Sequence, residues 1–189
     1  MRTRRFLWLF SLSVALILFS AYPGFSEVQP TPEAKRSIIT HAFTVDKGYY
    51  GYIWRIYIEG EDPDGSMLRI ASVVEQLGNG RYPTDWIYLK PQYQKHFRGY
   101  IQWNTFGSYA FYLPEWTQIT LKVSVFDKAG KESNEVVLPF TFQSGVKSPY
   151  EYMLPPPFDQ GDNAKLGNVF INLYQIYPSG SPSPMHASH

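Results

Sequence analysis

Three carboxylate side chains stand close together in the sequence, at Glu61, Asp62 and Asp64. Calcium and other hard cations bind about six to eight oxygen ligands, and clustered acidic residues commonly supply them. Two of these acids belong to the run Asp62-Pro63-Asp64-Gly65, whose proline and glycine are typical of a tight turn that needs no metal. The spacing of an EF-hand loop is absent. We therefore expect a turn here, with a calcium site as the alternative and no other cofactor.

Aromatic residues form the second group with binding chemistry, since they make up 17% of the chain, as much as the charged residues. Their rings stack on the apolar faces of sugars and anchor protein interfaces. Only about half of the side chains on a strand can face a core, so some rings must be exposed or covered by another segment. Packing in the core is the simpler alternative. The rings that we predict to contact a partner or ligand are Tyr49, Tyr50, Tyr82, Trp86, Tyr88 and Trp116.

The histidines give little basis for catalysis. His41 lies in a predicted strand, His96 directly precedes one, and His186 and His189 lie near the C-terminus. None of them belongs to a serine-nucleophile, zinc-ligand or glycine-rich phosphate-binding motif. The two acids of a glycoside hydrolase meet only in three dimensions and cannot be identified from spacing. We predict that the protein is not an enzyme, with a secreted hydrolase as the least favoured alternative.

The elements that would position these residues are strands, because apolar residues recur with a period of two. In residues 117–126 the alternation places Ile119, Leu121, Val123 and Val125 on one face, and in residues 67–76 it groups Leu68, Ile70 and Val74. The seven predicted strands are residues 37–45, 52–60, 67–76, 86–89, 97–103, 117–126 and 135–142. This number of short strands predicts an all-β fold, an antiparallel immunoglobulin-like β-sandwich over residues 37–142.

The chain changes character after the last of these strands. Residues 143–165 are rich in proline, glycine and serine and predict a linker. Residues 166–177 are apolar on alternate positions and predict one extra strand, while residues 178–189 are of low complexity and predict a disordered tail. The extra strand could cap an edge of the sheet or pair with a neighbouring subunit. We expect it to fold back on its own domain.

Two segments carry a resemblance to known modules. Residues 119–142, ITLKVSVFDKAGKESNEVVLPFTF, resemble the last hairpin of bacterial immunoglobulin-like and fibronectin type III-like modules. Residues 56–68, which contain EGEDPDGSML, are similar to the acidic turn of cadherin-like modules, where such turns coordinate calcium. The likeness implies a sandwich fold and implies that Asp127 joins the three acids of that turn, provided that both turns lie at one end. The chain lacks the cysteine pair of antibody domains, and Trp54 or Trp103 would be the core tryptophan.

The N-terminal residues predict export. The first five, MRTRR, carry three arginines and no acid, and the apolar stretch from Phe6 to Ala21 is shorter than a bilayer-spanning helix. Helix-breaking residues then precede Ser26, so residues 1–26 resemble a cleaved secretory signal peptide, with an uncleaved anchor as the alternative. Residues 27–36 form a polar lead. Because the sequence has no cysteine, acylation at a lipobox and disulfide bonds are both excluded.

Charge and composition limit the classes of molecule that can be the binding partner. Removal of three arginines from the 17 basic residues would leave 14 against 16 acidic ones, which argues against nucleic acid. A cleaved chain would keep no stable membrane span. We therefore expect a periplasmic or extracellular protein, a non-catalytic interaction or structural module of a bacterial cell envelope, with an envelope or extracellular protein as partner. A carbohydrate-binding module that uses exposed aromatic residues is the alternative.

Overall fold

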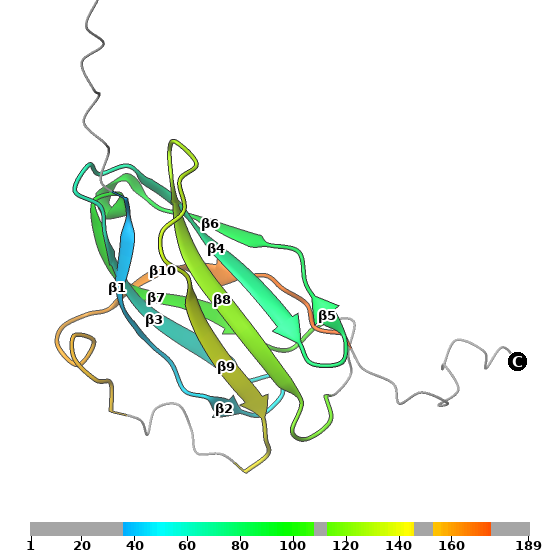
Figure 1. Cartoon of the computed structure of the whole chain (residues 1–189). Coiled ribbons are helices and arrows are strands. Elements are labelled where there is room, and N and C mark those ends of the chain that lie inside the picture. The colour runs from blue at the N-terminus through cyan, green and yellow to red at the C-terminus, as the bar shows by residue number, and fades with distance from the viewer. Residues whose placement is uncertain (1–35, 108–112, 146–152, 175–189) are drawn as a thin grey trace, which may run out of the picture. The chain divides into compact units, whose positions relative to one another are not determined.

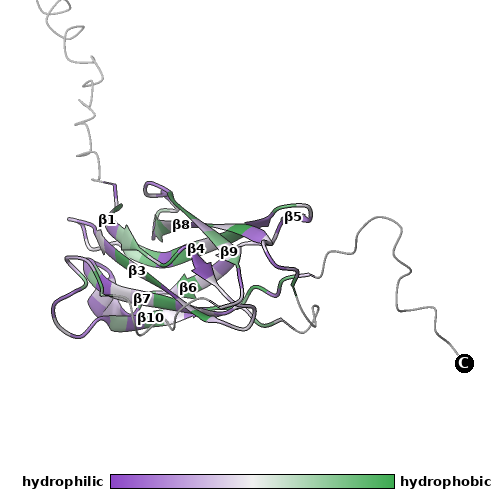
Figure 2. Ribbon diagram, turned by 90° about the horizontal axis from the view of Figure 1, so that it is seen from below, coloured by the Kyte–Doolittle hydropathy of each residue, from purple (hydrophilic) through white to green (hydrophobic). Residues whose placement is uncertain are grey.

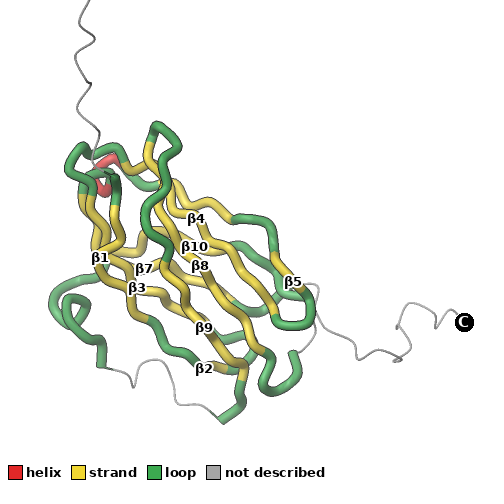
Figure 3. Tube along the Cα trace, in the orientation of Figure 1, coloured by secondary structure: helices red, strands yellow, loops and turns green. Residues whose placement is uncertain are grey.

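Two β-sheets pack face to face in the computed structural model of the protein, which describes residues 36–107, 113–145 and 153–174. These residues lie in the compact unit Ala34–His189 and contain ten strands and one short 3-10 helix, η1 (Pro91–Tyr93). Figure 2 shows the two layers, and Figure 3 shows the loops gathered at the ends of the strands. The all-β sandwich expected from the sequence is therefore confirmed.

The first sheet has four strands in the order β1-β3-β7-β10 (Figure 1). They are β1 (Ile38–Phe43), β3 (Ile53–Glu61), β7 (His96–Asn104) and β10 (Ala164–Val169). The central strand pairs, β1 with β3 and β3 with β7, are antiparallel, whereas β10 runs parallel to β7. The C-terminal strand thus occupies the edge position beside β7, where an immunoglobulin-like sandwich has an antiparallel strand from the middle of the sequence.

The second sheet has six strands in the order β2-β9-β8-β4-β5, and β6 also pairs with β4. They are β2 (Lys47–Gly48), β4 (Met67–Gln76), β5 (Gly80–Arg81), β6 (Asp85–Tyr88), β8 (Gln118–Asp127) and β9 (Val136–Phe142). All pairs are antiparallel except β2 with β9. The two-residue strands β2 and β5 were not predicted, since a period of two needs a longer run to be visible.

Two tryptophans lie at the centre of the core. Trp54 of β3 and Trp103 of β7 are opposite each other in the sheet, with ring centroids 6.1 Å apart, and both are fully buried. Phe140 of β9 packs on Trp54 from the other sheet, with ring centroids 4.4 Å apart. The alternation in β8 is as predicted, because Ile119, Leu121, Val123 and Val125 are all buried. The sandwich therefore has two core tryptophans rather than one.

The start of β4 departs from the predicted alternation. The register of β4 against β8 shifts between Met67 and Arg69, which is the signature of a β-bulge. The inserted residue moves the pattern by one position, so Met67 is fully buried and Leu68 is only partly buried. Ile70 and Val74, beyond the bulge, lie in the core as expected.

The segment after residue 153 folds back onto the sandwich. A Cβ at Gly99 would lie 2.1 Å from the Ala164 carbonyl oxygen, and one at Gly167 would lie 2.4 Å from Ile87 Cγ2, so glycine is required at both contacts. The part of the predicted linker that is described also packs here, since Phe158 is buried with its ring 5.7 Å from that of Tyr57. The described residues thus bear out the expectation that the extra strand caps its own sheet.

The extra strand ends earlier than predicted, at Val169. Residues 170–174 continue in irregular backbone, yet their side chains still alternate, with Ile171 and Leu173 buried and Phe170 76% exposed. Other predicted segments fall outside the described residues. These are the signal peptide at 1–26, most of the polar lead, residues 146–152 of the linker, residues 175–177 of the extra strand, and the tail at 178–189.

Leu173→Ala and Phe170→Ala test whether this segment belongs to the core. Leu173 is completely buried, so its truncation should lower the free energy of unfolding by about 2–5 kcal/mol. Phe170 points outward, so the matched change there should stay within about 0.5 kcal/mol. Urea denaturation measures both values. Equal, small effects of the two changes would show that the segment is not docked.

Candidate functional site

The two ends of the sandwich differ in chemistry. One end, here called the polar end, carries the turns between β3 and β4 and between β8 and β9, together with the loop before β7. Backbone hydrogen bonds join these turns, from Asp62 N to Lys95 O at 2.9 Å and from Lys128 N to Ser66 O at 2.9 Å. The other end carries exposed aromatic side chains and is here called the aromatic end. Both ends contain residues that the sequence predicted to bind a ligand or partner.

Asp62 organises the polar end. Its side chain is 1% exposed, and its Oδ1 accepts a hydrogen bond from Asp64 N at 2.9 Å. Oδ2 accepts from Ser66 N at 2.9 Å, from Ser66 Oγ at 2.7 Å and from Ser37 Oγ at 3.4 Å. Burial raises the pKa of the Asp62 carboxyl, but the hydrogen bonds from Ser66, Asp64 and Ser37 outweigh it and lower the pKa overall.

The four acids predicted as calcium ligands are not gathered into one site. Asp127 is also buried, and its Oδ1 accepts from Lys131 N at 2.8 Å within its own turn. Glu61 and Asp64 are exposed. Among the described residues no three histidine or acidic side chains are grouped so as to hold a metal ion. The two buried aspartates serve their turns, which is the alternative that the Asp-Pro-Asp-Gly sequence favoured.

The aromatic end gathers exposed rings from two loops, one between β2 and β3 and one between β7 and β8. Tyr49, Phe106 and Trp116 are 47%, 57% and 62% exposed. Tyr50 holds these two loops together, because its hydroxyl accepts from Gly107 N at 2.9 Å and donates to Gly107 O at 3.2 Å. The Tyr50 ring also lies 5.6 Å from that of Phe106 and 6.2 Å from that of Phe142, measured between centroids.

Trp116 has a strained backbone. Its φ of 67° lies in the left-handed region, which costs a residue other than glycine about 1–2 kcal/mol. The turn is fixed on both sides, since Trp116 N donates to Phe142 O at 2.8 Å and Thr117 N donates to Pro114 O at 3.1 Å. Strain of this kind is concentrated at functional sites. The exposed Trp116 ring is therefore held in place at a cost in conformational free energy.

The six predicted contact residues fall into three places. Tyr49, Tyr50 and Trp116 lie at the aromatic end, although Tyr50 is only partly exposed. Trp86 and Tyr88 lie on the outer face of β6, where Trp86 packs against the Arg69 guanidinium at 3.9 Å. Tyr82 does not reach the surface. Phe106 was not among the predicted contacts. Its ring packs against that of Tyr50, which places it at the aromatic end.

Tyr82 is 5% exposed because its hydroxyl serves an internal network. It donates to Gln76 Oε1 and accepts from Asn79 Nδ2 at 3.1 Å and from Tyr174 N at 2.8 Å. Burial raises the pKa of the Tyr82 hydroxyl. Period-two alternation cannot detect this role, because Tyr82 lies outside the strands and its partners come from three segments.

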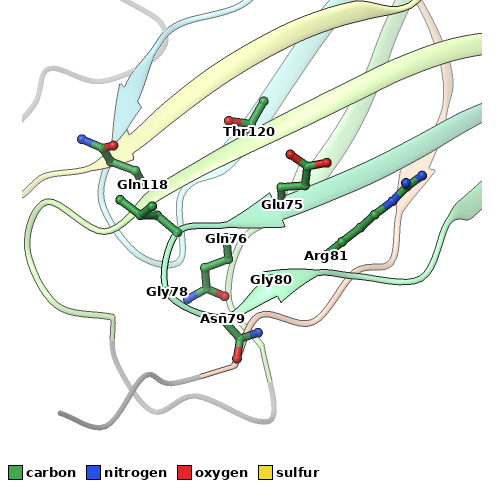
Figure 4. Close-up of a pocket in the computed structure, with 9 residues that line it drawn as sticks. Glu75, Gln76, Gly78, Asn79, Gly80, Arg81, Gln118 and Thr120 are labelled. Atoms are coloured by element: carbon green, nitrogen blue, oxygen red, sulfur yellow. The ribbon is translucent and has the colours of Figure 1, made fainter. Parts of the chain in front are cut away.

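A groove of about 590 Å³, lined mainly by residues of polar type, lies beside the β4–β5 hairpin (Figure 4). Figure 4 shows Glu75 and Thr120 on neighbouring strands, with Arg81 extended alongside. Glu75 Oε1 accepts from Lys122 Nζ at 2.8 Å, and this hydrogen bond lowers the pKa of the Glu75 carboxyl. Gly78 and Asn79 lie in the turn of this hairpin. Because the carboxylate is already paired, the groove offers polar contacts rather than a reactive group.

Sequence comparisons add no family to this picture. No protein-family model matches the chain, and no curated protein is detectably similar to it. In the part of the chain that the structure describes, no helix has the length and apolar character to span a membrane.

Asp62→Asn tests the turn at the polar end. At pH 7 the change should lower the free energy of unfolding by about 1–3 kcal/mol, because an amide group replaces a carboxylate that accepts from several donors. The folded-state pKa lies below the unfolded value of about 3.9, so this stabilisation is complete above that value and is lost as the pH falls through the folded-state pKa. Denaturation at several pH values measures the difference.

Asp64→Asn is the matched control for this turn. The Asp64 carboxyl is exposed, and only its backbone N–H contacts Asp62, so the change should alter stability by less than about 0.5 kcal/mol. A gap between the wild type and Asp62→Asn that stays constant below pH 4 would contradict the role of the ionised carboxylate.

Proposed function

We propose that the protein is an exported, non-catalytic β-sandwich that binds an envelope or extracellular protein through its aromatic end. The observation that carries this proposal is the exposure of Tyr49, Phe106 and Trp116 on anchored loops at one end of the sandwich. At the opposite end, the exposed residues of the turns are mainly charged, proline or glycine. The contrast singles out one end as a contact surface.

The exposed rings can contribute strongly to the affinity of a protein interface. Tyrosine and tryptophan are enriched among the residues that dominate protein-protein affinity, because each buries a large rigid surface at a small loss of side-chain entropy. The loops that carry the rings are tied to the sandwich by Tyr50 and by the Phe142 carbonyl. Binding would therefore cost little additional loop entropy.

Export and an envelope location rest on the sequence. The arginine-rich start and the apolar stretch to Ala21 are typical of a secretory signal peptide, and the absence of cysteine leaves the domain to be held by its core. The non-catalytic assignment rests on the lack of a reaction motif in the sequence. The buried tryptophans and the docked C-terminal segment supply such a core in the structure.

Site-specific photo-cross-linking in the producing cells tests the contact surface. Benzoylphenylalanine placed at position 49 or 116 should give a covalent adduct with the same envelope or extracellular protein. With the probe at position 49, Trp116→Ala should reduce the yield of that adduct severalfold, because truncation of a central ring weakens an interface. Mass spectrometry identifies the adduct.

Positions 64 and 128, exposed at the polar end, are the matched controls for the probe. They should give no adduct with that protein. Adducts of equal yield from both ends, or none from positions 49 and 116, would refute the assignment of the aromatic end.

A further inference from the structure

A second groove, of about 320 Å³, follows the seam between β7 and β10. It is separate from the groove beside the β4–β5 hairpin and lies on strands from the middle and the end of the sequence. The residues that line it are Gln102, Asn104, Phe106, Asn168, Val169, Phe170, Ile171 and Asn172. This volume lies within the range of small-molecule sites.

The parallel register of the two strands explains why these side chains meet. Asn168 is opposite Gln102, and Val169 is opposite Trp103. Because Val169 and Trp103 point into the core, Gln102 and Asn168 point to the outer face of the sheet. The alternation continues past the ends of both strands. It brings Asn104, Phe106, Phe170 and Asn172 to the surface, where all four are exposed.

The groove is built from carboxamides and rings. None of its lining side chains ionises. Gln102, Asn168 and Asn172 make no side-chain hydrogen bond within the part of the chain that the structure describes, and Asn104 uses only Oδ1, which accepts from Phe106 N at 3.1 Å. A carboxamide offers both donors and an acceptor, which match the hydroxyl groups of a sugar. The exposed faces of Phe106 and Phe170 can stack on the C–H face of a pyranose ring.

We infer that this groove binds a neutral oligosaccharide. Two flanking rings with uncharged donors and acceptors between them suit a ligand that alternates apolar faces and hydroxyl groups. A charged glycan would find no partner of opposite charge among the lining residues. The inference goes beyond the proposed protein contact and does not depend on it. Phe106 belongs to both surfaces, but Tyr49 and Trp116 do not line this groove, and Asn168 and Phe170 are not part of the proposed protein contact.

The groove is formed before a ligand arrives. Phe170 N donates to Asp85 Oδ2 at 2.9 Å, and the Trp103 indole N–H donates to Ile171 O at 2.9 Å. A Cβ at Gly107 would lie 3.2 Å from Leu173 N, so the two loops that form the end of the groove are in close contact. Such anchoring reduces the entropy lost on binding and fixes the spacing of the rings.

Calorimetric titration of the purified protein with cellohexaose, xylohexaose, maltohexaose and hexa-N-acetylchitohexaose tests the inference. At least one should bind saturably, and high salt should not weaken the binding, because no charges are involved. Phe170→Ala and Asn168→Ala should each weaken it about tenfold, through the loss of stacking or of a hydrogen bond.

Tyr88→Ala is the matched control, since Tyr88 is an exposed ring on β6 that does not line the groove. It should leave the affinity unchanged. The absence of saturable binding to all four saccharides would overturn the inference, as would binding that survives both groove substitutions. Either result would leave the cross-linking at positions 49 and 116 unaffected, so the two proposals fail separately.

Discussion

Two core tryptophans have buried indole N–H groups, and each of these groups requires a hydrogen-bond acceptor. The rest of the structure depends on how this requirement is met. Trp54 donates to Val45 O at 2.9 Å, and Trp103 donates to Ile171 O at 2.9 Å. Neither acceptor belongs to a strand, so each tryptophan ties an irregular segment to the centre of the sandwich. One segment leads to Tyr49 at the aromatic end, and the other carries Phe170 at the groove. The hydrogen bonds of the two core tryptophans therefore also fix the position of both candidate surfaces.

The C-terminal segment gains a structural role from this arrangement. It supplies Val169, Ile171 and Leu173 to the core and covers the edge of β7, which would otherwise present unpaired backbone groups to other chains. Close approach requires glycine at positions 99 and 167, where any side chain would collide with Ala164 or Ile87. The extra strand that the sequence predicted to fold back therefore closes the edge of a domain that has no disulfide bonds. The outward positions of the same segment remain free for binding, because they contribute nothing to the core.

The sequence allowed the longer strands to be predicted and left their neighbours unknown. The strand over residues 67–76 has the predicted bounds, because Leu68, Ile70 and Val74 recur at even spacings along it. The bulge after Met67 could not be seen, since it arises from pairing with β8 and not from local composition. The turn at Asp62 was predictable from its proline and glycine, whereas the burial of Tyr82 depends on a network with Gln76 and Tyr174. The groove depends on a parallel register between residues 102 and 168, for which no local signal exists.

The separation of the two ends follows from how each turn satisfies its backbone groups. At the polar end, the carboxylates of Asp62 and Asp127 accept from the amides of their own turns, so short loops suffice and few apolar atoms are exposed. At the aromatic end the loop between β7 and β8 spans residues 105–117, and it is held by the Tyr50 hydroxyl and by main-chain bonds to Phe142. Side chains that do not stabilise their own loop, such as Trp116, are then free to face outward. We therefore expect substitutions of the buried carboxylates at the first end to act on stability, and substitutions of exposed rings at the second end to act on the proposed binding.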